Sequence, residues 1–138
     1  METKLFNYPV VIREHYLDSL GHMHNTVYQT LLEEALWEFM HENGYGLKQL
    51  VDQGFAPVLL ESSIKYLKEL KLRDEILIET HLASVEGKVV KMEFHMVRNG
   101  EVCCSALITL GLLNLKERKL AAPTPEWIKS LGITDWQA

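Results

Sequence analysis

The sequence predicts an α+β fold in which one long helix packs against an antiparallel sheet. Within residues 26–43, apolar side chains recur three and four positions apart, as they do in a helix that covers a core. After Gly54, four successive apolar segments alternate with polar residues or run continuously, as strands do. One helix followed by strands favours a single domain over residues 1–138, with a helical layer on a sheet.

The helix and the segment before it have recognisable boundaries. A short β-branched run predicts the first strand at residues 8–14, and a polar loop follows it. Asn25 is the expected N-cap, because an asparagine side chain can accept a hydrogen bond from the first helical turn. Gly44 and Gly46 are expected to end the helix, since glycine readily adopts the left-handed conformation.

The second half of the chain is expected to complete a five-stranded sheet that wraps around the helix. Asn99-Gly100 is typical of a two-residue type I′ hairpin, so we expect neighbouring strands to be antiparallel. A short helix is expected at residues 123–131, with a proline at its first position and Gly132 after it. The predicted strands after the long helix are residues 57–67, 75–85, 89–98 and 102–115.

Composition excludes several classes of function. The 138 residues carry a net charge of −5, and the 14 basic residues are scattered, which argues against general nucleic-acid binding. No segment has the apolar length of a membrane span, and the first residues do not resemble a signal peptide, so we expect a cytoplasmic protein without membrane insertion. Cys103 and Cys104 are adjacent, so we expect reduced, buried thiols that point to opposite faces of a strand.

The predicted architecture also suggests self-association. A single helix covers only one face of a five-stranded sheet and leaves apolar strand edges exposed. Proteins commonly cover such edges by pairing with a second copy. We therefore expect a homodimer or a homotetramer.

The loop before the long helix contains an unusual group of residues. Asp18 is followed by Gly21, His22, Asn25 and, ten positions after the aspartate, Tyr28. The helix then continues through Glu33-Glu34-Ala35. This pattern resembles the signature of hotdog-fold acyl-CoA thioesterases of the 4-hydroxybenzoyl-CoA thioesterase type.

The resemblance extends over nearly the whole chain. Pro57-Val58, Tyr66 and the segment from Leu72 to Thr80 resemble the second and third strands of that family, and Pro123-Thr124-Pro125-Glu126 resembles its common ending. The chain departs from the pattern in two places. The family often has a proline where this chain has Glu69 or Leu70, and a glycine where it has Arg73.

The resemblance implies a hotdog fold and hydrolysis of an acyl-CoA or acyl-carrier-protein thioester to a carboxylic acid and a free thiol, without a metal or another cofactor. It implies that Asp18 is the general base or the nucleophile. Such a reaction also needs donors aimed at the oxygen on which negative charge develops. The unpaired N–H groups at the start of the helix, near Asn25 and Thr26, are candidates for this oxyanion hole. His22 is expected to hydrogen-bond within the loop or to line the pocket.

Other residues are candidates for substrate binding. Gly21 would allow a turn or a close backbone approach that a side chain would obstruct. Basic residues near the end of the second predicted strand could meet the phosphates of coenzyme A, although lysines on strand ends commonly only protect an edge. The candidate substrate-binding residues are Gly21, Tyr28, Glu33, Tyr66, Lys68 and Arg73.

Several alternatives stay open. An aspartate in a polar loop commonly closes an Asx-turn, which is the simplest role for Asp18. Asp18, His22 and His24 could also be read as metal ligands, and Glu33 or Glu34 could supply the working carboxylate. Two other functions are a hotdog hydratase or dehydratase that uses Asp18 and His22, and a binding module that holds acyl thioesters without turnover.

Overall fold

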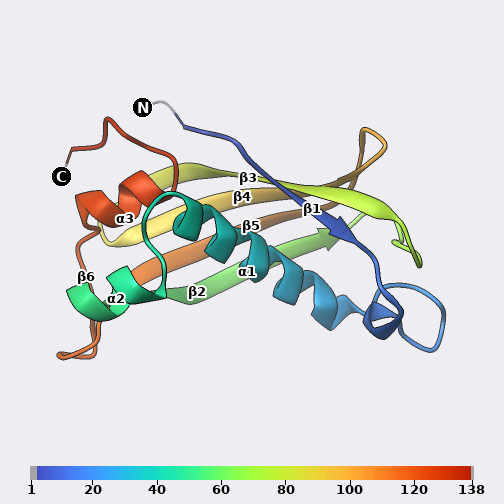
Figure 1. Ribbon diagram of the computed structural model, residues 1–138, viewed down its shortest axis with the longest axis horizontal. Helices are drawn as coiled ribbons and strands as arrows, with labels where there is room; N and C mark the ends of the chain where they lie inside the picture. Colours follow the sequence, from blue (N-terminus) through green and yellow to red (C-terminus); the bar gives the residue numbers. More distant parts are fainter. Residues whose placement is uncertain (1–2, 138) are drawn as a thin grey trace.

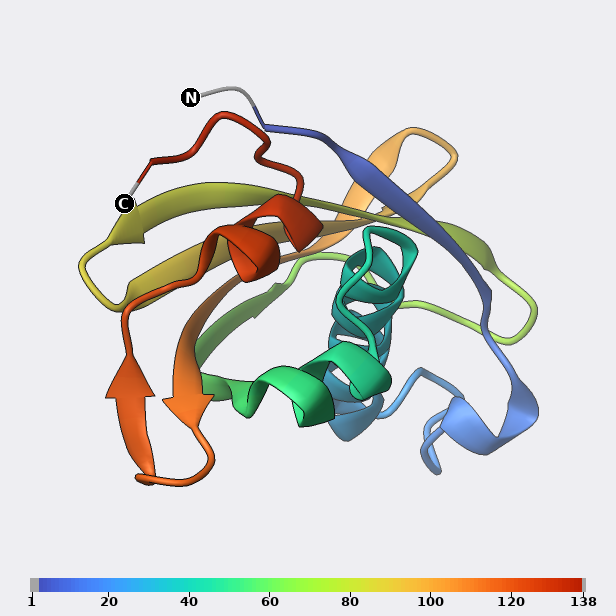
Figure 2. The same ribbon diagram turned by 60° about the vertical axis from the view of Figure 1, so that its left-hand side comes forward.

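A curved antiparallel sheet wraps around helix α1 in the computed structural model, which describes residues 3–137 (Figure 1, Figure 2). The strands run in the order β1-β3-β4-β5-β2, and β6 pairs with β5 alone. The α+β class and the long central helix are confirmed. The elements are β1 (Phe6–Val11), a 3₁₀ turn (Glu14–Tyr16), α1 (Asn25–Glu42), α2 (Leu47–Gln53), β2 (Phe55–Tyr66), β3 (Glu75–Glu86), β4 (Val89–Arg98), β5 (Glu101–Asn114), β6 (Lys119–Ala121) and α3 (Pro125–Ser130).

The sheet has six strands, so the prediction of five was wrong. The additional strand, β6, is three residues long and pairs Leu112 with Ala121. A segment this short carries no recognisable alternation. The first strand also lies earlier than the expected residues 8–14, because pairing with β3 extends from Phe6 to Val11 and stops there.

Gly44 ends α1 in the left-handed conformation, with a φ of 91°, as predicted. The predictions for Gly46 and for the N-cap were wrong. Gly46 is the N-cap of α2, which the sequence did not predict, and Gln49 accepts a hydrogen bond from its backbone N–H. The N-cap of α1 is His24, because its extended backbone lets Nδ1 accept from the N–H of Thr26. Asn25 is therefore the first helical residue. The predicted C-terminal helix is confirmed but is shorter than residues 123–131, since α3 starts with Pro125 after the cap Thr124 and ends at Ser130.

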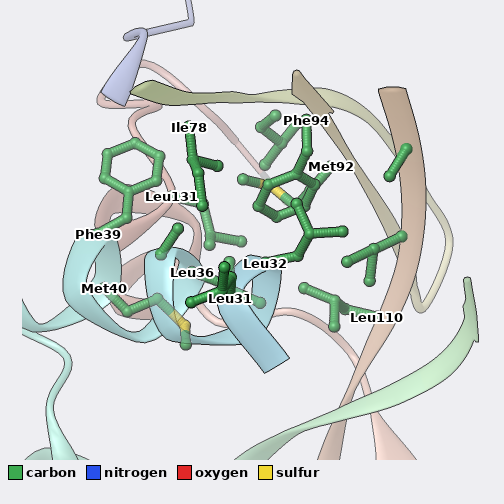
Figure 3. Packing of buried hydrophobic residues seen from close by; sticks show 14 of the residues in the cluster. Leu31, Leu32, Leu36, Phe39, Met40, Ile78, Met92, Phe94, Leu110 and Leu131 are labelled. Atoms are coloured by element: carbon green, nitrogen blue, oxygen red, sulfur yellow. The ribbon is translucent and has the colours of Figure 1, made fainter. Parts of the chain in front are cut away.

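The core lies between α1 and the concave face of the sheet (Figure 3). Leu32 and Phe39 of α1 are fully buried. The side chains opposite them come from three strands, with Ile78 on β3, Phe94 on β4 and Leu110 on β5. The predicted buried face of β4 is confirmed. Its members are Val90, Met92, Phe94 and Met96.

A bulge in β5 explains why both cysteines are buried. Asn99 and Gly100 both have positive φ angles, 51° and 79°, which confirms the predicted hairpin. Beyond it, Cys104 pairs with Met96 while Val102 pairs with the next residue of β4, so Cys103 is an extra, unpaired residue. The two cysteines therefore do not alternate between faces as expected. Both are buried free thiols.

Within residues 3–137, no helix is both long enough and apolar enough to cross a membrane.

Candidate active site

The loop before α1 is fixed against the connection between β2 and β3. Backbone bridges join Leu17 to Met23 and His22 to Lys71. The N–H of Met23 donates to the carbonyl of Leu70 over 2.9 Å, and the Met23 side chain is buried. These contacts hold the loop beside the first turn of the helix.

Asp18 closes this loop through its side chain. Its Oδ1 accepts hydrogen bonds from the N–H groups of Leu20 at 2.8 Å and His22 at 3.3 Å. The Leu20 bond is the main cause that lowers the pKa of Asp18, and the His22 bond adds to it. Asp18 therefore makes the Asx-turn that was one alternative, and it is ionised at neutral pH. Within residues 3–137, Oδ2 receives no hydrogen bond from the protein.

The start of α1 presents one open backbone donor. Thr26 donates its N–H to His24 Nδ1 over 3.1 Å, and Val27 donates to the carbonyl of His24. Across the described part of the chain, the N–H of Asn25 has no protein acceptor. The helix dipole adds partial positive charge at this position. Within residues 3–137, the Asn25 N–H, rather than that of Thr26, is therefore the donor left without a protein acceptor at this turn.

These groups line one open pocket of about 330 Å³ at the N-terminal end of α1. It brings together several residues that the sequence singled out, and it adds others from the loop and from the end of β2. The lining consists of Asp18, His22, Met23, Asn25, Tyr28, Tyr66, Leu67, Lys68 and Glu69. A wider depression of about 650 Å³ lies at the opposite end of α1, near Glu42 and Lys129, and none of the candidate residues lines it.

Two tyrosines line the pocket, of which Tyr28 is buried and Tyr66 is exposed. The rings of Tyr28 and Tyr66 meet edge to face with centroids 4.9 Å apart. Burial raises the pKa of Tyr28 to about 12, so its phenol stays protonated at neutral pH. Because Tyr28 is on α1 and Tyr66 ends β2, this contact joins the helix to the edge of the sheet.

His22 is oriented by a glutamate that the sequence did not identify as a site residue. Its Nε2 lies 2.7 Å from Glu69 Oε2, and Lys71 lies 3.1 Å from the other oxygen of Glu69. The hydrogen bond from Lys71 is the main cause that lowers the pKa of Glu69. The only signal for Glu69 was that it stands where the family often has proline. His24, by contrast, faces Thr26, so the two imidazoles serve different partners.

A partly buried ion pair between Arg98 and Asp74 anchors the strand connection that carries Glu69. Arg98 Nη1 donates to the carbonyl of Glu69 at 3.0 Å and to Asp74 Oδ2 at 2.7 Å. Asp74 also accepts from the N–H of Lys71 at 2.8 Å. Burial opposes ionisation of Asp74, yet the bonds from Lys71 and Arg98 leave its pKa below its usual value. Arg98, the last residue of β4, therefore holds the connection between β2 and β3 that carries Glu69.

Four candidate residues lie outside the pocket lining. Gly21 forms the turn, with a φ of 84°. Thr26 is turned toward His24, and Glu33 lines a separate small cavity of about 40 Å³. Arg73 forms a two-oxygen ion pair with Glu14, 2.7 and 2.9 Å long. It has a φ of 67°, which a glycine would adopt more easily.

Comparison with known proteins identifies the family. Residues 12–131 match the family model of the thioesterase-like superfamily. The chain belongs to this family. It is 29% identical over 115 residues to the long-chain acyl-CoA thioesterase FadM of Escherichia coli K12, covering 82% of this chain and 86% of that protein. It is 25% identical to the acyl-CoA thioesterase YbgC of Haemophilus influenzae, covering 85% of this chain and 87% of that one.

Solved structures share its fold. A hypothetical protein of Staphylococcus aureus in complex with CoA superposes with a TM-score of 0.86 at 19% identity, over 94% of this chain and 83% of that one. The probable thioesterase YbaW of Escherichia coli gives a TM-score of 0.83 at 24% identity, over 92% of this chain and 98% of that one. The predicted hotdog fold and the predicted family are therefore confirmed.

Proposed function

We propose that this protein hydrolyses an acyl-CoA thioester, with Asp18 as general base or nucleophile and the N–H of Asn25 as the oxyanion donor. The observation that carries the proposal is that an ionised carboxylate and an open helix N-terminus line the same pocket. Membership of the thioesterase-like superfamily supports it. So do the acyl-CoA thioesterase activities named for FadM and YbgC and the CoA bound to the staphylococcal protein.

In the general-base route, Asp18 removes a proton from water while the water oxygen attacks the carbonyl carbon. Negative charge then develops on the carbonyl oxygen, where the Asn25 N–H and the helix dipole stabilise it. Collapse of this intermediate breaks the C–S bond, and the proton held by Asp18 goes to the departing thiolate. In the nucleophilic route, the Asp18 carboxylate attacks the carbonyl carbon and the C–S bond breaks, which gives a mixed anhydride and a thiolate. Water then hydrolyses the anhydride, which restores Asp18 and supplies the proton that the thiolate takes up. Both routes release an acid and a thiol.

The rim of the pocket suits the carrier end of the substrate. Lys68 lines the pocket and is exposed, and Lys71 lies beside Glu69 at its edge. Ammonium groups here can pair with the phosphates of coenzyme A or with the acidic surface of an acyl carrier protein. Arg73 is held by Glu14 and would have to exchange that partner to take part.

A second copy of the chain is the proposed partner along β2. This strand is an edge of the sheet, and Leu59 and Leu60 on it are 43% and 45% exposed. Trp37 on α1 is 40% exposed. A homodimer or homotetramer that covers this edge would remove apolar surface and unpaired backbone groups from water. Because Tyr66 ends β2, such an interface would adjoin the pocket.

The second candidate is hydration or dehydration of an acyl thioester by Asp18 and His22. It is favoured by one observation, the 2.7 Å contact that holds His22 at the pocket wall with Glu69 behind it. A carboxylate that contacts one ring nitrogen fixes the orientation of an imidazole, as acid–base catalysis requires.

The test is thiol release from short, medium, long and aromatic acyl-CoAs by the unaltered protein and by Asp18→Asn. The asparagine keeps an oxygen for the N–H groups of Leu20 and His22, so the loop should stay folded. We expect about 10²- to 10⁴-fold loss of kcat with little change in acyl-CoA affinity. Asp52→Asn, on the exposed face of α2, is the matched control and should retain full activity.

An Asp18→Asn variant that keeps its rate would overturn the assignment of Asp18. If neither protein releases thiol but enoyl-CoA is hydrated, the second candidate replaces the first. If acyl-CoA binds and no reaction is detected, the protein is a binding module.

A further inference from the structure

Glu69 contacts the loop that carries Asp18, although it comes from the connection between β2 and β3. Its Oε2 lies 2.7 Å from Nε2 of His22, and both side chains line the pocket at the start of α1. The hydrogen bond from Lys71 is the main cause that lowers the pKa of Glu69, so this carboxylate is ionised at neutral pH. An ionised carboxylate only accepts hydrogen bonds, so Nε2 of His22 carries the hydrogen of this contact.

His22 in turn contacts Asp18 through its backbone in both directions. The N–H of His22 donates to Asp18 Oδ1 over 3.3 Å, and the carbonyl of His22 accepts from the N–H of Asp18 over 2.8 Å. The 3.3 Å bond is the longer of the two that Oδ1 receives, since Leu20 donates over 2.8 Å. It is therefore the contact of the Asp18 carboxylate that a small movement of His22 would break first.

Glu69 is itself held in place by two basic residues. Lys71 Nζ lies 3.1 Å from its Oε1, and Arg98 donates to its backbone carbonyl over 3.0 Å. Among residues 3–137, Glu69 is also the one side chain in an ion pair with the His22 imidazole. The pocket wall therefore holds the ring of His22 through a carboxylate whose own position is fixed.

We propose that Glu69 is a positioning residue for Asp18 that acts through His22. The inference rests on the proposed function, since it takes Asp18 as the group that reacts. Glu69 holds the imidazole at the pocket wall, and His22 then keeps its N–H on Oδ1 of Asp18. Oδ2, which receives no hydrogen bond from residues 3–137, stays free to take a proton or to attack the carbonyl carbon. Reacting groups that are displaced by about 1 Å lose much of their rate.

The test compares thiol release by the unaltered protein, Glu69→Ala and Glu69→Gln, with the best acyl-CoA of the panel. We expect Glu69→Ala to lower kcat about 10-fold and to change KM less than about 2-fold, because it displaces Asp18 and leaves the lysines of the rim in place. Glu69→Gln should keep most of the rate, since its amide oxygen can still accept from Nε2. Glu86→Ala, at the exposed end of β3, is the matched control and should keep full activity.

The pH profile distinguishes positioning of Asp18 from a smaller folded fraction. The bond from Leu20 is the main cause that lowers the pKa of Asp18, and the bond from His22 adds to it. Loss of the His22 bond raises this pKa, and Asp18 must be ionised to react. The acid limb of kcat/KM should therefore move to higher pH in Glu69→Ala. A smaller folded fraction would lower the rate without moving the limb.

A double-mutant cycle tests whether the effect passes through His22. His22→Ala removes the ring and keeps the backbone N–H, so we expect about the same 10-fold loss, and Glu69→Ala should then have no further effect. Losses that multiply in the double variant would overturn the inference. A loss in His22→Ala about 100-fold greater than in Glu69→Ala would also overturn it, because the imidazole would then act on the substrate itself.

Full activity of Glu69→Ala, beside a large loss in Asp18→Asn, would overturn this inference and leave the thioesterase proposal intact. An acid limb that does not move, or a Glu69→Gln variant as slow as Glu69→Ala, would overturn it as well. The side chains of His22 and Glu69 are 42% and 47% exposed, so all these variants should fold. No thiol release by the unaltered protein from any of a wide panel of thioesters would instead remove the proposed function, and this inference with it.

Discussion

The two ends of helix α1 differ in how many of their polar groups are bonded within the protein. At the N-terminal end, His24, Asn25 and Thr26 are all exposed, and the cap is a single local contact. At the C-terminal end, Phe39 and Met40 are fully buried. In Figure 1 these ends lie at opposite sides of the molecule, one beside the loop before α1 and the other beside α3.

Long-range hydrogen bonds secure the C-terminal end. The Asn43 amide donates to the carbonyl of Phe39 at 3.1 Å and to that of Ser130 at 3.2 Å. Trp127 of α3 is fully buried, with Nε1 3.4 Å from the sulfur of Met40. The two ends of α1 therefore differ in their role in the structure. Its C-terminal half stabilises the fold through buried contacts, while its N-terminal turn has the N–H of Asn25 without a protein acceptor among residues 3–137.

The largest effect on stability is expected from Trp127→Ala. Removing this side chain empties space against α1, and truncation of a buried aromatic residue costs about 3–5 kcal/mol. Urea unfolding should show this loss, while the folded fraction keeps its kcat because the candidate active-site pocket lies at the other end of α1. A change below about 1 kcal/mol would contradict the division between the two ends.

An intermediate effect is expected from Arg98→Met, which leaves Asp74 and the Glu69 carbonyl without their donor. The loss of these two hydrogen bonds, of which the one to Asp74 is part-buried, should lower the free energy of unfolding by about 1–3 kcal/mol. Because the pKa of Asp74 is lowered in the folded protein, its contribution is present above the usual aspartate pKa and is lost as pH falls through the folded value.

Removal of Arg98 raises the folded pKa of Asp74, so acid unfolding of this variant should begin at a higher pH. Unfolding curves measured between neutral pH and pH 3 check this result. If the unaltered protein and Arg98→Met unfold at the same acidic pH, Arg98 does not lower the pKa of Asp74.

The smallest effect on stability is expected from His24→Asp, which also tests the role of Asn25. Aspartate is a stronger N-cap and its charge favours the helix dipole, so stability should rise by about 0.5–1 kcal/mol. The same charge beside the Asn25 N–H disfavours an oxyanion, and we expect kcat to fall by about 10-fold. Thermal unfolding and thiol release measure the two effects. A variant that gained both stability and rate would exclude Asn25 as the oxyanion donor.

Local patterns predicted most of the fold. The α1 periodicity, the alternation along β4 and the Asn99-Gly100 hairpin each depend on neighbouring residues, and the structure has all three. The missed elements depend on distant partners. Helix α2 is seven residues long and β6 three, and the Cys103 bulge is set by pairing with β4. None of these leaves a periodic signal.

In the candidate site, too, the residues close together in the sequence were predicted, and the residue brought in by a distant contact was not. Asp18, His22, Asn25 and Tyr28 belong to one continuous segment, so their spacing made them recognisable, and they line one pocket. Glu69 joins them only because the loop pairs with Lys71, more than forty residues away. His24 was missed as the cap because histidine is not a preferred N-cap residue.

The β5 bulge has a practical consequence for chemical labelling. Both thiols are buried, and burial raises the pKa of Cys104 to about 12, which leaves almost no thiolate to react. A disulfide reagent added to detect released coenzyme A should therefore not be consumed by the native enzyme. The same reagent would react with both cysteines once the sheet opens, so a single absorbance trace can distinguish turnover from unfolding.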